Sequence, residues 1–159
     1  MSVHYAHSDL PRPLTLRLYL PRTWLAEPAR LHAAGVPRRL GVPQNKVQVA
    51  LELLDAVRAA GVPGRAVLAG AQYGTSHEFG DGLAMRGLPY LEPVFRQQAL
   101  VGEADVLGQV AETCRRLKDI LGLDHFEGRS WCGFHHHACV VRLAYNFLVE
   151  EHPRRFPVA

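Results

Sequence analysis

The sequence has little lysine, methionine and cysteine. Of its 159 residues only Lys46 and Lys118 are lysines, so arginine supplies nearly all of the positive charge. The three cysteines, Cys114, Cys132 and Cys139, are an odd number at spacings that fit neither a disulfide framework nor a C-x-x-C pair. We therefore expect a reduced protein that resides in the cytoplasm.

Long apolar runs and several well-known catalytic motifs are also missing. No run approaches the roughly 20 apolar residues that cross a bilayer, and residues 1–13 do not have the basic start and apolar core of a signal peptide. There is no G-x-S-x-G nucleophile elbow and no glycine-rich loop with phosphate-binding spacing. We expect no membrane partner, and we find no support for nucleophilic catalysis or for a P-loop nucleotide site.

What is present is enough apolar sequence for one domain with a core. Hydrophobic residues make up 48% of the chain, and 18 basic against 15 acidic residues give a formal charge of +3. A charge this small does not by itself identify a polyanionic partner. The clustering of basic residues along the chain has to decide that point.

In the first part of the chain, periodicity predicts an α/β order. Residues 14–20 alternate apolar and polar positions as a half-buried strand does, with Leu14, Leu16, Leu18 and Leu20 on one face, and residues 3–7 are expected to pair with them as a hairpin. Further predicted elements are a helix from a Thr23 cap to Gly35, a helix over 44–61, a strand at 65–70, a helix at 76–85 and a strand at 88–93. This order is typical of an α/β layer with some parallel pairing.

Two helices are predicted after residue 102. An apolar stripe at three-four spacing, formed by Leu107, Val110, Cys114, Leu117 and Leu121, predicts a helix over 103–121 that Gly122 ends. A final helix is expected from residue 131 or 133 to residue 151, with Phe134, Ala138, Val141, Leu143, Tyr145 and Leu148 as its apolar positions.

Residues 125–141, HFEGRSWCGFHHHACVV, concentrate four histidines and two cysteines. A zinc site would take Cys132 and His135, with His137 or Cys139 as further ligands, but consecutive helical residues point about 100° apart and no second cluster completes a tetrahedral set. Basic and aromatic residues between 115 and 142 suggest instead a surface that contacts nucleic-acid phosphates. The alternative is a solvated helix face with aromatic rings that join the two helices.

Three segments, residues 14–37, 50–90 and 116–148, resemble DDE transposases of bacterial insertion sequences. The similarity is to the subgroup whose C-terminal block reads approximately ELK-x-ELGLDHFEGRSW-x-G-[FW]-HHH. The resemblance implies an RNase H-like fold, in which a mixed β-sheet flanked by helices presents two aspartates and a glutamate to two Mg²⁺ or Mn²⁺ ions. Those ions would activate a water or a DNA 3′-hydroxyl for attack on a phosphodiester.

The chain departs from the catalytic pattern of that family. The first aspartate would lie on a strand before the hairpin, the second is replaced by Gly70 in GAQYG, and the third position holds Ala111, with Glu112 one residue later and rotated by about 100°. The β-rich insertion that usually follows the RGLPY strand is also missing. We therefore expect a truncated, internally deleted and catalytically defective relative with no metal cofactor of its own, in which Glu112 is the one candidate catalytic residue.

We expect a single partial domain over residues 1–159. It comprises an α/β part at 1–92, a junction at 93–102, a helical part at 103–151 with the two C-terminal helices, and a tail at 152–159. The expected partner is DNA, bound through Lys118, Arg129, His135, His136 and His137, and the resemblance also suggests an oligomer with an intact transposase. Two alternatives stay open: an active metal-dependent transposase or nuclease that uses Asp55, Asp81 or Glu112, and a small metal-binding or regulatory protein that uses Cys132 and His135.

Overall fold

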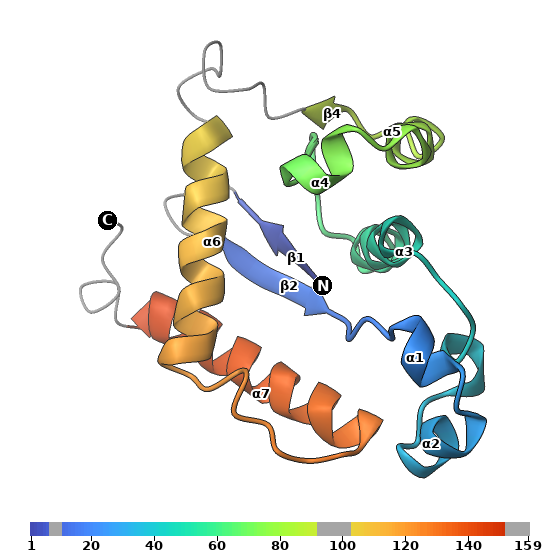
Figure 1. Cartoon of the computed structure of the whole chain (residues 1–159). Coiled ribbons are helices and arrows are strands. Elements are labelled where there is room, and N and C mark those ends of the chain that lie inside the picture. The colour runs from blue at the N-terminus through green and yellow to red at the C-terminus, as the bar shows by residue number, and fades with distance from the viewer. Residues whose placement is uncertain (7–10, 92–102, 152–159) are drawn as a thin grey trace.

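The computed structural model describes residues 1–6, 11–91 and 103–151, which form a mixed α/β protein (Figure 1). The junction and the tail expected at 93–102 and 152–159 lie outside the described residues, as does most of the hairpin turn. The elements are β1 (Ser2–Tyr5), β2 (Arg12–Leu16), α1 (Arg22–Leu25), α2 (Pro28–Ala33), a 3-10 turn (Arg38–Leu40), α3 (Lys46–Ala59), β3 (Val67–Leu68), α4 (Ala71–Gly74), α5 (His77–Ala84), β4 (Tyr90–Leu91), α6 (Glu103–Asp119) and α7 (Trp131–Glu151).

The N-terminal hairpin is confirmed, although its second strand is displaced from the predicted range. β1 and β2 pair antiparallel from Ser2 opposite Leu16 to Tyr5 opposite Arg12, with an irregularity after Val3. β2 therefore ends four residues before the predicted strand does. Leu18 is 40% exposed, so the expected face of four leucines does not form. The chain leaves the strand at this point and leads into α1.

The helix predicted from Thr23 to Gly35 is two short helices. Pro28 occupies the first turn of α2, where its missing N–H costs nothing, but no continuous helix can pass through it because the proline ring would clash with the preceding turn. α1 begins after Pro21, so Thr23 lies inside the helix and is not its cap. Gly35 does end the segment, with a positive φ of 70°.

α3 and α5 carry the first apolar core. Asn45 and Gln48 form a reciprocal capping box at the start of α3, and Ser76 accepts a hydrogen bond from the Phe79 amide at the start of α5. Leu51 of α3 packs with Phe79 and Leu83 of α5, which are 2% and 0% exposed. This core supports β3 and β4, since Val67, Ala69, Leu88 and Tyr90 also pack against it.

The expectation of some parallel pairing is confirmed by the 65–70 and 88–93 segments, which pair in a sheet of their own. β3 pairs in parallel with β4 only, and β1 pairs with β2 only, so the described residues contain two two-stranded sheets and not one mixed sheet. No described strand bridges β1 and β3. A cavity lies between them instead.

α6 and α7 confirm the two predicted C-terminal helices, and they form the second core. Leu117 packs with Val141, Tyr145 and Val149 of α7. Thr113, which the apolar stripe did not include, is 1% exposed, and its hydroxyl lies 3.1 Å from the Tyr145 hydroxyl. Leu143, expected among the apolar contacts of α7, is instead 59% exposed. Among the described helices, none is both long and apolar enough to cross a membrane.

Candidate functional site

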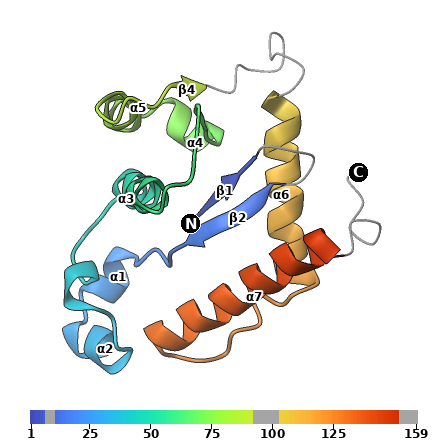
Figure 2. The same ribbon diagram turned by 180° about the vertical axis from the view of Figure 1, so that it is seen from behind.

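A large cavity separates the two sheets. It has a volume of about 1010 Å³. Its lining is mainly apolar and comes from β1, α3, the segment 63–70 that includes β3, and α6. In Figures 1 and 2, β1 and α6 lie on one side of this region and α3 and α4 on the other. A volume of this size is in the upper part of the range for ligand pockets.

Two strand edges border this cavity. The Val67 amide donates a hydrogen bond to Pro89 O at 2.8 Å, so one edge of β3 faces β4. Residues 67 and 68 of β3 and residues 2–5 of β1 nevertheless line the cavity, and each of these strands has one strand partner among the described residues. An unpaired strand edge is a template for another extended segment. The cavity is therefore suited to a further strand as well as to a small molecule.

Of the two positions that the family resemblance marks as catalytic, Gly70 lines the same cavity and Ala111 follows one of its lining residues. Gly70 lines it and forms the N-terminal boundary of α4 with an ordinary φ of −63°. A Cβ atom built on Gly70 would meet nothing within 4 Å, so an aspartate would fit there. On α6, Val110 lines the cavity, and Ala111 follows it as an exposed residue. Gly70 thus borders the cavity, Ala111 lies one residue after a lining residue of α6 without itself lining the cavity, and the sequence leaves both positions without a carboxylate.

Glu112 is engaged in ion pairs along α6. Its carboxylate accepts two hydrogen bonds from Arg115, at 2.7 and 2.8 Å, and one from Arg116 Nε at 2.8 Å. These bonds, those from Arg115 first, lower the pKa of Glu112 to about 2. Two cations already occupy this carboxylate, and it is not among the residues that line the cavity.

The other candidate carboxylates lie elsewhere. Asp55 on α3 accepts a bidentate pair from Arg86 at 2.6 and 2.7 Å, which lowers the pKa of Asp55, and Asp81 lies exposed on α5. Within residues 1–6, 11–91 and 103–151, no three His, Cys, Asp or Glu side chains gather closely enough to hold a metal ion. The described lining of the large cavity contains no Asp or Glu. The described lining therefore does not offer the carboxylate oxygens that Mg²⁺ and Mn²⁺ prefer as ligands.

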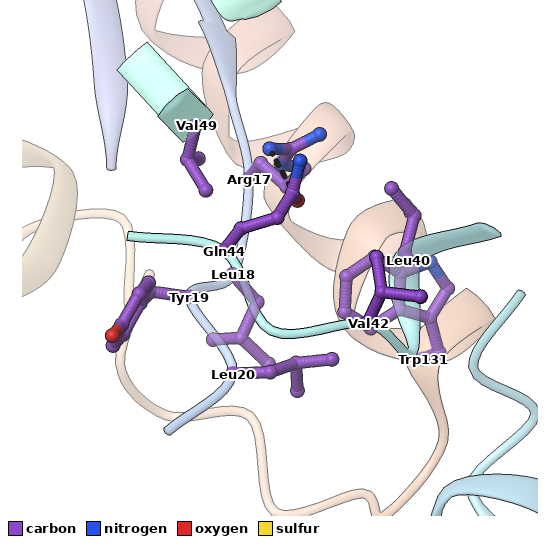
Figure 3. Close-up of a pocket in the computed structure, with 9 residues that line it drawn as sticks. All are labelled: Arg17, Leu18, Tyr19, Leu20, Leu40, Val42, Gln44, Val49 and Trp131. Atoms are coloured by element: carbon purple, nitrogen blue, oxygen red, sulfur yellow. Dashed lines mark hydrogen bonds between the residues drawn. The ribbon is translucent and has the colours of Figure 1, made fainter. Parts of the chain in front are cut away.

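A second, much smaller cavity lies where residues 17–20 meet the loop before α3 and the start of α7 (Figure 3). Trp131, Leu40 and Val42 form its apolar part, and the Arg17 and Gln44 side chains approach one another at its rim. Arg17 donates to Glu52 Oε2 at 2.6 Å and to Gln44 Oε1 at 3.3 Å. With about 10 Å³, the cavity has room for about one water molecule and is not a ligand site.

The residues expected to bind DNA divide into exposed and inward-facing groups. Lys118 and Arg129 are exposed and form no ion pair with another described residue, and His136 is exposed on α7. His135 and His137 instead turn toward the protein. His135 Nδ1 donates to Trp131 O at 2.9 Å and its ring contacts the Trp131 ring at a tilt of 36°, whereas His137 Nε2 donates to Gly122 O at 2.9 Å.

The glycines and aromatics of residues 125–134 have a structural role, in line with the alternative that aromatic rings join the two helices. Ser130 Oγ accepts from the Gly133 amide at 3.1 Å, which caps α7. The Phe126 ring lies so close to Gly128 and Gly133 that a Cβ atom would approach it to 2.3 and 3.0 Å, respectively. Phe126 also contacts the rings of Phe134 and His137. The signature therefore builds the connection that fixes α7 against the end of α6.

These features define a mixed α/β protein whose candidate site lies where a strand end and a long helix border one cavity. Residues 1–116 match the family described as DDE superfamily endonuclease, and because the match covers well over half of the chain, the protein belongs to that family. Membership supports a function of the transposase or nuclease type and implies DNA as a partner. The match ends before Lys118 and the 125–134 connection. No curated protein and no solved structure matches the chain.

Proposed function

We propose that this protein is a DNA-binding member of the DDE transposase type that no longer cuts DNA. The observation that carries the proposal is the cavity between β3 and α6. Gly70 and Ala111 stand at the two positions where the family resemblance calls for carboxylates. Glu112, the nearest acidic residue along the helix, is held by Arg115 and Arg116.

Loss of cleavage follows from the chemistry of the reaction. Two-metal phosphoryl transfer needs carboxylates that hold both ions near the attacking and leaving oxygens. Releasing Glu112 for this task would break its ion pairs with both Arg115 and Arg116. Binding of DNA needs no divalent ion in this proposal, because phosphates can be neutralised by lysine and arginine alone.

The proposal includes a partial RNase H-like fold. The antiparallel β1–β2 hairpin and the parallel β3–β4 pair supply both kinds of strand pairing that a mixed sheet contains. Residues of β1 and β3 line one cavity, and a single further strand between them would join the two pairs. α6 packs beside β1, as the 3.6 Å contact between Cys114 Sγ and His4 Nε2 indicates.

DNA contact is assigned to the α6–α7 region. Lys118 lies at the end of α6, Arg129 in the connection and His136 on α7, and all three are exposed. Arg115 and Arg116 contribute less positive charge to this surface because Glu112 pairs with both. A cytoplasmic location and pairing with an intact relative belong to the same proposal.

The salt dependence of DNA binding tests this assignment. Fluorescence anisotropy with a labelled 30-base-pair duplex, measured in EDTA at several salt concentrations, should give binding whose affinity falls as salt rises. Replacing both Lys118 and Arg129 by alanine removes two phosphate contacts and should reduce the slope of log K against log salt by about 2.

Lys46→Ala provides the matched control, because Lys46 is an exposed lysine at the start of α3, remote in sequence from the proposed surface. It should leave the slope nearly unchanged. Equal slopes for the double variant and the wild-type protein would contradict the assignment of the binding surface. Absence of binding at low salt would contradict the proposed function as a whole.

A further inference from the structure

α7 has an exposed apolar stripe on the side opposite its core contacts. The exposed residues of the helix begin with Cys132 and His136, continue through Val140, Leu143 and Phe147, and end with Glu150 and Glu151. At 3.6 residues per turn they fall within an arc of about 100°. Val140, Leu143 and Phe147 are 51%, 59% and 59% exposed, and they occupy the middle of the stripe.

The stripe is separate from the face that holds the helix in the fold. Ala138, Val141, Tyr145 and Val149 are at most 6% exposed and lie on the opposite side of α7. Intramolecular packing of the described residues thus leaves the stripe uncovered. Apolar residues spaced by three and four positions along a helix form the seam by which one helix packs against another.

We propose that a second copy of this chain covers the stripe, with the two α7 helices antiparallel across a two-fold axis near Leu143. The stripe is self-complementary about that point. Phe147 of one copy then lies beside the Val140 region of the other, and Leu143 lies close to its own equivalent. Such a self-matching patch is what an isologous dimer requires.

The acidic residues at one end of the stripe favour the antiparallel arrangement. Seven residues separate His136 from Leu143, and seven separate Leu143 from Glu150, so each His136 lies opposite Glu150 and Glu151 of the partner subunit. A parallel pair would bring the two acidic ends together instead. Glu150 also accepts a 2.8 Å hydrogen bond from Arg12 of its own chain, whereas Glu151 forms no ion pair with another described residue. Antiparallel helix dipoles add to the same preference.

The strength of the contact is limited by its size. A helix of 21 residues is about 32 Å long, so two such helices form an interface at the low end of specific protein contacts. We expect a reversible dimer that forms at micromolar concentrations. Sedimentation velocity of the whole chain from about 1 to 100 μM should show a monomer that converts to a dimer.

The first test replaces the central residue. Leu143→Lys places two ammonium groups at the axis and should weaken dimerisation at least tenfold, whereas Met85→Lys, at an 87% exposed position after α5, should not change it. Circular dichroism establishes that each variant is folded. If Leu143→Lys does not fold, Leu143→Ala takes its place. A protein that stays monomeric at 100 μM, or a dimer that Leu143→Lys leaves intact, would overturn the proposal.

The second test fixes the geometry. In a Cys132→Ser background, Leu143→Cys should form a disulfide-linked dimer on mild oxidation, because a residue near the axis meets its equivalent, and Met85→Cys should not. His136→Glu should weaken the dimer by repelling the acidic end of the partner, while His136→Lys should preserve it. Cross-linking equal to that of Met85→Cys, or equal effects of the two His136 variants, would contradict the antiparallel arrangement.

Discussion

Replacing either of two glycines in α5 by alanine is expected to change the stability of the protein in opposite directions. Gly80 and Gly82 lie two residues apart in His77–Ala84, so alanine improves the helix propensity at both positions by about 1 kcal/mol. A Cβ atom on Gly80 meets nothing within 4 Å. On Gly82 it would lie 2.4 Å from Leu51 Cδ1, 3.1 Å from Cδ2 and 3.3 Å from Cγ. The two variants therefore separate helix propensity from packing between α5 and α3.

The magnitudes decide the sign at each position. Leu51 is 9% exposed and belongs to the core with Phe79 and Leu83, so its side chain has little room to move aside. Overpacking a core typically costs about 1–3 kcal/mol, which outweighs the gain in propensity. We expect Gly82→Ala to lower the free energy of unfolding by up to about 2 kcal/mol and Gly80→Ala to raise it by about 0.5–1 kcal/mol.

Urea denaturation followed by circular dichroism measures both changes. With a slope of about 2 kcal/mol/M, the two variants should differ by roughly 1 M in midpoint. Leu51→Ala combined with Gly82→Ala should show favourable coupling, since the smaller residue makes room for the new methyl group. If Gly82→Ala were as stable as Gly80→Ala, the close contact between α3 and α5 would be wrong.

Three further predictions concern titratable groups. His137→Ala should lower the free energy of unfolding by about 1–3 kcal/mol, because the Gly122 carbonyl loses the hydrogen bond that His137 donates. His136→Ala should change it by less than about 0.5 kcal/mol in the same denaturation assay. Burial lowers the pKa of His4 to about 4, so as the pH falls the unfolded chain is protonated at this histidine before the folded protein is. The free energy of unfolding should therefore decline between about pH 6.5 and pH 4, by up to about 3 kcal/mol. His4→Gln should remove that decline from the pH dependence of the urea midpoint. The Glu112 carboxyl should titrate near its lowered pKa of about 2 in an NMR titration, and Arg115→Ala should move the midpoint upward; a wild-type midpoint near the ordinary value for glutamate would contradict the ion-pair geometry.

The sequence predicted the long elements better than the short ones. α3 and α6 have three-four periodicity, α7 is a long apolar-rich segment, and positive φ angles at Gly61 and Gly122 follow the first two helices as expected. β3 and β4 are two residues long, and such strands are specified by their partner more than by their own pattern. Pro28 shows that one residue can divide an otherwise helical pattern.

The sequence located the positions that correspond to the family's catalytic residues, but it did not predict the side-chain contacts around them. The segment GAQYG and the spacing to Lys118 located Gly70 and Ala111, and the structure places the end of β3 and the face of α6 at one cavity. The ion pairs of Glu112 and the inward orientation of His135 and His137 depend on tertiary packing. Periodicity does not report which of three adjacent histidines remains exposed.

The central claim is that this DDE superfamily protein binds DNA without cutting it. The most direct test incubates the purified chain with supercoiled plasmid in Mg²⁺ or Mn²⁺, after binding to the labelled duplex has been demonstrated in EDTA. We predict binding with no conversion of the plasmid to its nicked or linear forms. Cleavage that requires the divalent ion and is lost in Glu112→Ala would contradict this account.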